Sequence, residues 1–201
     1  MKQLSKKGII VSIILACSLV IGTVEVSAES NATSTKKVVQ TASKKKMVSK
    51  KGVITLPKKF KTKTVMSELR PEAAKLIKTY GASLGDGKTK AFKTYAIKHL
   101  ATKKDGRYML GYDYSVENYN DKVKRTREAN TKKNNANYSK AVKKVTTSKV
   151  EYGHYTVRNG FANFSFSFQP KNYSPMNSVT VFLDFKQLEN GKYVLESIHY
   201  Y

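Results

Sequence analysis

The C-terminal part of the chain, from residue 150 on, has the most regular alternation of apolar and polar positions. Two stretches alternate strictly, and their apolar members are Phe164, Phe166 and Phe168 in the first and Val179, Val181, Leu183 and Phe185 in the second. A period of two is typical of a β-strand with one buried face. Residues 150–157 and 193–200 are rich in β-branched and aromatic residues, which favour strands. The pattern therefore predicts four strands.

Asn-Gly pairs mark two of the connections between these strands. Asn159-Gly160 separates the first two strands, and Asn190-Gly191 separates the last two. A type I′ turn needs positive φ at both central residues, which asparagine and glycine tolerate. Residues 170–177 form the remaining loop. The four strands are therefore predicted to be antiparallel.

Two upstream segments repeat apolar residues with the period of a helix. The first spans 71–81, with Pro71 at the first helical position and Gly81 or Gly85 at its end. The second spans 87–101 and follows the capping pair Asp86-Gly87. Amphipathic helices are the available cover for a sheet with one apolar face. The predicted fold class is therefore α+β, with two N-terminal helices packed on an antiparallel sheet of about four strands.

The segment between the helices and the strands has no clear period. Residues 107–114 fit a short strand or an aromatic loop, 118–129 a weak and highly polar helix, and 131–137 an asparagine-rich loop. Residues 29–64 are dominated by lysine, serine and threonine, and they are predicted to be a disordered tail with a short extended piece at 53–56. A single α+β domain is predicted for 65–201.

The N-terminus has the three parts of a secretory signal peptide. A lysine-rich start precedes a charge-free apolar run, and Val26-Ser27-Ala28 offers a small residue for cleavage after Ala28. Residues 1–28 are therefore predicted to be a signal peptide and the protein to be secreted, extracellular or associated with the cell wall. Two alternatives stay open, a membrane anchor through residues 8–24 and lipidation at Cys17.

Lysine gives the chain its basic character, with a formal net charge of +24. Such a charge attracts polyanions, of which anionic wall polymers and membrane headgroups lie nearest to a protein secreted by a Gram-positive cell. Arginines are few, so nucleic acid is a partner only without sequence specificity. The lysines predicted to bind polyanions lie in the tail: Lys36, Lys37, Lys44, Lys45, Lys46, Lys50, Lys51, Lys58 and Lys59. The alternative is that lysine only keeps the domain soluble.

The sequence predicts no catalytic residue, no metal site and no cofactor. The three histidines lack the close spacing of metal ligands, and the only cysteine lies in the leader. No His-Glu-x-x-His motif and no Rossmann fingerprint is present. One set of residues is nevertheless a candidate pocket, because it joins an acid in an aromatic setting to a histidine. Its members are Tyr112, Asp113, Tyr114 and His154.

The C-terminal phrase Leu-Glu-Asn-Gly-Lys-Tyr-Val-Leu-Glu-Ser-Ile, residues 188–198, resembles the closing hairpin of NTF2-like (cystatin-like) domains of secreted Gram-positive proteins. The resemblance covers residues 66–201. Tyr193 stands where a tryptophan is common, and residues 117–149 have no counterpart. The resemblance implies a curved sheet wrapped around helices, with a cone-shaped pocket, and it does not imply one function.

Three functional hypotheses follow. The first is a secreted, non-catalytic binding or accessory protein of the cell envelope, attracted to anionic polymers and offering a pocket or patch to a protein partner. The second is a secreted enzyme that uses the NTF2-like pocket, which a buried acid with a shifted pKa in that pocket would favour. The third is a cationic toxin or antimicrobial factor, although the tail lacks the apolar face of an interfacial helix.

Overall fold

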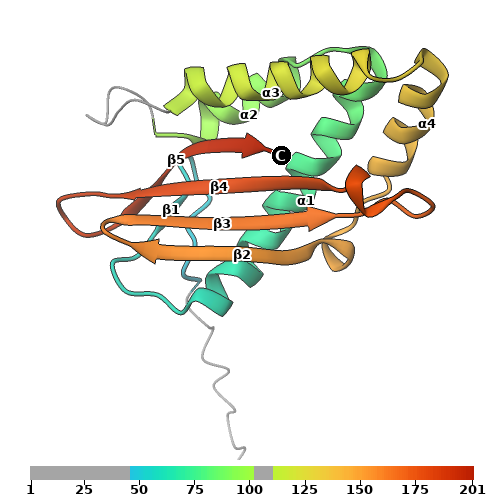
Figure 1. Cartoon of the computed structure of the whole chain (residues 1–201). Coiled ribbons are helices and arrows are strands. Elements are labelled where there is room, and N and C mark those ends of the chain that lie inside the picture. The colour runs from blue at the N-terminus through green and yellow to red at the C-terminus, as the bar shows by residue number, and fades with distance from the viewer. Residues whose placement is uncertain (1–45, 102–110) are drawn as a thin grey trace, which may run out of the picture. The chain divides into compact units, whose positions relative to one another are not determined.

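Five antiparallel strands form one sheet in the computed structural model, which describes residues 46–101 and 111–201. Their order across the sheet is β1-β5-β4-β3-β2 (Figure 1). Their bounds are β1 Thr55–Leu56, β2 Glu151–Arg158, β3 Phe161–Phe168, β4 Val179–Gln187 and β5 Tyr193–Tyr200. The four predicted strands are confirmed, and β1 is an addition.

The two Asn-Gly connections lie where the sequence places them. Asn159 and Gly160 have φ of 49° and 76°, and the residues on either side, Arg158 and Phe161, are paired. This is the two-residue hairpin with positive φ at both positions that the sequence predicts. In the second connection Gly191 has φ of 79° and joins β4 to β5.

Four helices accompany the sheet. They are α1 Thr62–Asp86, α2 Lys90–His99, α3 Gly111–Glu128 and α4 Lys132–Val142, with short 3₁₀ helices η2 Thr147–Lys149 and η3 Pro175–Asn177. Helix α1 crosses behind the sheet, α4 stands at one end of it, and α2 and α3 lie on the β5 side (Figure 1). The α+β class is confirmed, with four helices and five strands in place of two and about four.

Helix α1 is longer at both ends than the predicted helix over 71–81. Pro71 lies inside it rather than at its start. An interior proline removes a helical hydrogen bond, but the buried residues Val65 and Leu69 before it continue the apolar face that Leu76 forms after it. Burial of that face along the whole length stabilises the helix in spite of the proline.

The end of α1 is also later than predicted. Gly87 ends the helix with φ of 78°, and its N–H donates to Ser83 O. Gly81 has a different role, because a Cβ at that position would lie 2.8 Å from Val142 Cγ1. Gly81 therefore allows α4 to approach α1 closely. The second helix, predicted over 87–101, is α2, but its N-cap is Thr89 and not the predicted pair Asp86-Gly87, which ends α1.

The middle of the chain departs most from the sequence prediction. Residues 132–137, predicted as part of a loop, begin α4, and residues 111–114, predicted as a strand or loop, begin α3. The helix predicted over 118–129 is confirmed, because α3 contains it up to Glu128. Helix α4 turns polar residues inward: Ser139 Oγ donates to Gly81 O over 2.7 Å, and Asn135 Nδ2 donates to Arg127 O over 2.8 Å. A helix held by buried polar groups has no apolar period to recognise.

The predicted disordered tail is wrong for its described part, residues 46–64. This part contains β1 and the first residues of α1, and Val48, Ile54 and Leu56 are buried in the core. The short extended piece predicted at 53–56 is confirmed by β1. Residues 29–45 lie outside the described residues.

The predicted signal peptide 1–28, its cleavage at Ala28, and the alternatives at 8–24 and Cys17 also lie outside the described residues. Within the part that the structure describes, no helix has both the length and the apolar character needed to cross a bilayer.

Strand β5 is closed on the side away from β4 by groups from several elements. β1 pairs with it over only two residues, Thr55 opposite Val194 and Leu56 opposite Tyr193. The next residue, Leu195, donates its N–H to Ile54 O over 2.9 Å and accepts from Ala101 N over 2.8 Å.

Side chains of α3 close the rest of this edge. Ile198 N–H donates to Ser115 Oγ, and Tyr200 N–H donates to Asn118 Oδ1, each over 2.9 Å. Ser115 is fully buried and donates its own hydrogen to Gly111 O. The two side chains thus occupy the place of a neighbouring strand.

Replacing Ser115 with alanine should destabilise the fold, because the buried N–H of Ile198 would lose its acceptor. An unsatisfied buried donor costs about 1–3 kcal/mol. We expect the free energy of unfolding in urea to fall by that amount. The exposed neighbour on the same helix provides the control, since Glu117→Ala should change it by less than about 0.5 kcal/mol. Equal effects of the two substitutions would contradict this account of the edge.

Candidate functional site

The four residues of the predicted pocket lie on two separate parts of the fold. Tyr112, Asp113 and Tyr114 are on the first turn of α3, which packs against β5, and the Tyr114 ring lies 6.4 Å from that of His199. His154 is on β2, at the other edge of the sheet. Strands β4 and β3 intervene, at about 4.8 Å per strand. The structure therefore does not bring His154 together with the other three.

The predicted polyanion-binding lysines divide into three groups. Lys36, Lys37, Lys44 and Lys45 lie outside the described residues. Lys50 is held internally: its Nζ donates to Glu68 O and lies 3.9 Å from Glu72 Oε1, and burial lowers the pKa of its ammonium. Lys50 therefore already has partners within the fold, although its side chain is 31% exposed, and its role in polyanion binding stays a prediction.

The remaining described lysines of that prediction lie at or near the surface. Lys51 is exposed, and Lys58 is exposed with its methylene groups beside Gly191. Lys46 and Lys59 line a cavity of about 500 Å³ together with Lys192, which comes from the β4–β5 connection. We call this the hairpin cavity; its other lining residues are Met47, Thr55, Leu56 and Pro57. Its lining contains three ammonium groups and no acid.

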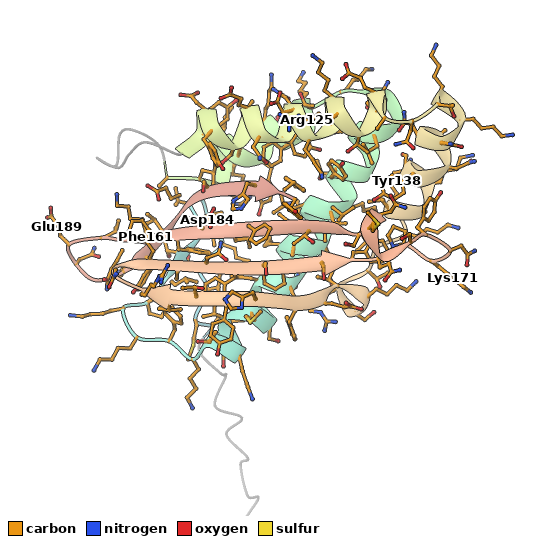
Figure 2. The ribbon with its side chains drawn as sticks, viewed as in Figure 1. Arg125, Tyr138, Phe161, Lys171, Asp184 and Glu189 are labelled. Atoms are coloured by element: carbon orange, nitrogen blue, oxygen red, sulfur yellow. The ribbon has the colours of Figure 1, made fainter. Side chains whose placement is uncertain are left out.

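A second cavity, of about 550 Å³, also has three lysines in its lining. They are Lys144 after α4, Lys149 on η2 and Lys171 in the loop after β3. We call it the loop cavity; its other lining residues are Ala141, Ser148, Glu151, Phe168, Gln169 and Asn172. Lys171 lies at the opposite end of the sheet from Glu189, which shares the β4–β5 connection with Lys192 (Figure 2). The two lysine cavities are therefore at opposite ends of the sheet.

The loop cavity is built on a fixed main chain. Arg70 of α1 donates from Nε to Val150 O over 2.6 Å and from Nη2 to Ser148 O over 2.8 Å. These bonds hold the segment that carries Lys149. The buried Phe168 lies in the lining on the β3 side. The lysines thus project from a constrained frame, although their long side chains remain adaptable.

A groove of different character runs between α3, α4 and η3. It consists of two adjoining cavities of about 350 and 740 Å³, which share Lys122, Thr126, Asn130, Asn177 and Tyr201. Tyr114 of the predicted pocket lines the larger one. Burial lowers the pKa of the Lys122 ammonium, and the nearby Arg125 lowers it further. Glu117 and Asp121 also line the groove, so its charge is mixed.

Two acids with shifted pKa values lie on the sheet. Asp184 is on the face of β4 that no described helix covers (Figure 2). It accepts from His199 Nδ1 over 2.9 Å, from Ser197 Oγ over 2.8 Å and from Asn163 Nδ2. Burial raises the pKa of its carboxyl, but these donors outweigh burial, and the resulting pKa lies below its ordinary value. The Asp184 network is therefore satisfied in the charged state.

The second acid is Glu196 on β5, which is only 5% exposed. Burial raises the pKa of its carboxyl, and the Lys186 ammonium, 4.0 Å away, partly opposes this. Neither Glu196 nor Asp184 lines the hairpin cavity, the loop cavity or the groove.

Comparison with models of protein families, with curated proteins and with solved structures gives no match to this chain.

Sequence reasoning did not identify the loop cavity or the Asp184 network. Lys144, Lys149 and Lys171 come from three separate segments, and only the path of the chain brings them together. Asp184 follows strict alternation within β4, and nothing in that pattern distinguishes it from the other polar positions on the same face. The pairing of Asp184 with Ser197 and Asn163 depends on strand register, which the sequence fixes only near the turns.

Replacing Asp184 with asparagine should lower stability most at neutral pH. The folded-state pKa is below the unfolded value, so the carboxylate stabilises the fold above about pH 4, and this contribution is lost as the pH falls through the folded pKa. We expect D184N to be less stable by about 1–2 kcal/mol at pH 6. The difference should narrow between about pH 5 and pH 2.

Urea unfolding of both proteins across this pH range measures the difference. Glu189→Gln, in the exposed β4–β5 connection, is the matched control for loss of a carboxylate. A gap between wild type and D184N that is constant with pH would show that the charge of Asp184 contributes nothing to stability.

Proposed function

We propose that this chain is a secreted, strongly basic, non-catalytic binding or accessory protein of the bacterial cell envelope, which holds anionic polymers. The observation that carries the proposal is the pair of lysine cavities, each lined by three lysines from different segments of the fold. The export signal at 1–28, with cleavage after Ala28, and an NTF2-like relationship of the domain are parts of the same proposal.

The chemistry of both cavities suits phosphate-bearing polymers. An ammonium group acts as a point charge that accepts many approach geometries, so three of them around one hollow can contact phosphates of a flexible chain without a fixed register. The two cavities lie at opposite ends of the sheet, so one long polymer or two neighbouring ones would have two points of contact. The groove is less suited to this role, because its two acids, Glu117 and Asp121, equal its two basic residues in number. The loop cavity has three lysines against one acid, Glu151.

The enzyme alternative is favoured by an acid with a shifted pKa inside a cavity. The two acids in the described chain whose pKa values are shifted, Asp184 and Glu196, lie on the sheet and line none of the cavities above. Asp184 is surrounded by donors that stabilise its charged form. This arrangement supports a binding role over an acid–base one.

Binding to a phosphate-bearing polymer should weaken steeply with salt, because contact releases condensed counterions. The chain from Glu29 onward, which contains the whole compact unit Ser43–Tyr201, is titrated with purified wall teichoic acid at several salt concentrations. The triple substitutions K144Q/K149Q/K171Q and K46Q/K59Q/K192Q should each lower the affinity about tenfold near 0.1 M salt. Each should also reduce the slope of log K against log salt by roughly 2, since each lost phosphate contact removes about 0.7–0.9.

The matched control removes the same charge from exposed positions on α1, in the turn after it and at the start of α2, as K78Q/K88Q/K90Q. It should change the slope by much less than either cavity triple. If all three triples behave alike, attraction is diffuse and the cavities have no special role. Binding of the wild type that does not change with salt would overturn the proposed function itself.

A further inference from the structure

The edge strand β2 is the most exposed part of the sheet. It stands at the end of the strand order and has no strand beyond it (Figure 1). Three of its apolar side chains are 42–49% exposed: Tyr152, Tyr155 and Val157. Phe161, just past the hairpin, is 51% exposed. An exposed edge with apolar side chains is a template for pairing with another strand.

The other edge of the sheet makes this exposure significant. The β5 edge is closed by β1, by Ala101 and by the α3 side chains Ser115 and Asn118. No comparable group is described along β2. The fold therefore protects one edge and leaves the other open.

Strand β2 is nevertheless held in a fixed position. Arg70 donates to Ser148 O and Val150 O at its start, and the Arg70 guanidinium lies 4.9 Å from the centre of the Tyr152 ring. A strand that is already ordered loses little conformational entropy when it binds a partner.

A bulge determines which face each side chain of β2 occupies. Tyr152 is opposite Phe166, and Tyr155 is opposite Phe164, so Gly153 and His154 together face one residue of β3, Ser165. Ser165 Oγ donates to His154 O, and a Cβ on Gly153 would lie 2.4 Å from Ser165 Oγ. Gly153 and His154 therefore count as a single position of the strand.

With the bulge counted once, β2 has seven positions that alternate between two faces. Tyr152, Tyr155 and Val157 lie on the face of the core, because their cross-strand neighbours Phe166, Phe164 and Ala162 are buried. Glu151, the bulge, Thr156 and Arg158 lie on the opposite face. The middle position of the seven is Tyr155.

This arrangement is self-complementary. In an antiparallel pairing with a second copy, centred on Tyr155, Glu151 would lie opposite the partner's Arg158, and Tyr152 opposite the partner's Val157. The bulge would lie opposite the partner's Thr156. Every pair joins side chains on the same face, and the two terminal pairs join opposite charges, which stabilises cross-strand pairing. A shift in register would break both charge pairs.

We propose that β2 pairs antiparallel with β2 of a second copy of this chain, about a two-fold axis at Tyr155, to form a continuous sheet across a homodimer. The occupant is a second copy because the charges at the two ends of the strand complement each other in that pairing. A single pair of strands is a small interface, so association is weak and transient.

The dimer has a salt dependence opposite to that of polymer binding. Each copy carries a large positive charge, and salt screens the repulsion between copies. Salt also screens the two pairs of Glu151 with Arg158, but these involve four charges against the net charge of two whole chains. The dimer fraction should therefore rise between about 0.05 and 0.3 M salt. Failure of this proposal is thus distinguishable from failure of the proposed function, whose signal falls with salt.

The decisive experiment is a charge exchange measured by sedimentation velocity on the chain from Glu29 onward, from about 10 μM to about 1 mM in about 0.15 M salt, a range set for a weak interface. We expect E151R and R158E each to weaken dimerisation about tenfold, because each places like charges opposite one another twice in the symmetric dimer. The double variant E151R/R158E restores opposite charges and should return to within about twofold of wild type.

Apolar-to-lysine substitutions supply an independent test. V157K removes an apolar contact with the partner's Tyr152 and should weaken the dimer at least tenfold. I97K is the matched control, because Ile97 is also exposed, at 63%, but lies on α2. Circular dichroism confirms that each variant is folded. A wild type that stays monomeric at 1 mM would overturn the proposal. So would a double variant E151R/R158E that dimerises no more tightly than the single variants. Either result would leave a strand of another protein as the possible occupant of the edge.

Discussion

The structure depends on the need to satisfy both edges of β5. One edge pairs with β4 along most of its length. The other has only two residues of β1, so the remaining main-chain groups bond Ile54, Ala101, Ser115 and Asn118. Because a buried N–H without an acceptor is costly, this requirement fixes the position of α3 and of the chain after α2. Together with burial of Val48, Ile54 and Leu56 in the core, it also accounts for the order of residues 46–64.

The cavities follow from the same arrangement. β1 is held against β5, and this brings Lys46 and Lys59 beside Lys192 of the β4–β5 connection. At the other end, α4 packs on α1 through Gly81 and Val142, and this places Lys144 near Lys149 and Lys171. The lysines are not grouped along the sequence at either site. They come together because α4 packs on α1 at one end of the sheet and β1 pairs with β5 at the other.

The strands and their turns could be predicted because their signals are local. Alternation at Phe164, Phe166 and Phe168 requires only one buried face, and Asn159-Gly160 accepts the positive φ of its turn. Helix α4 could not, because Ser139 and Asn135 face inward and bond main-chain oxygens of α1 and α3. Both partners lie outside α4, so the periodicity of its own residues does not reveal them. The predicted pocket had the same weakness, since convergence of His154 with Asp113 depends on strand order.

The net charge of the chain affects both polymer binding and dimerisation. A chain with a net charge of +24 repels its own copies, and this repulsion opposes any association through β2. A polyanion in the lysine cavities neutralises part of that charge, and it also raises the local concentration of copies along one polymer. The loop cavity is lined by Glu151, which is also the first residue of β2. Polymer binding at that cavity would therefore occur beside the terminal charge pair of the dimer, so that the two equilibria are coupled by electrostatics at a single residue.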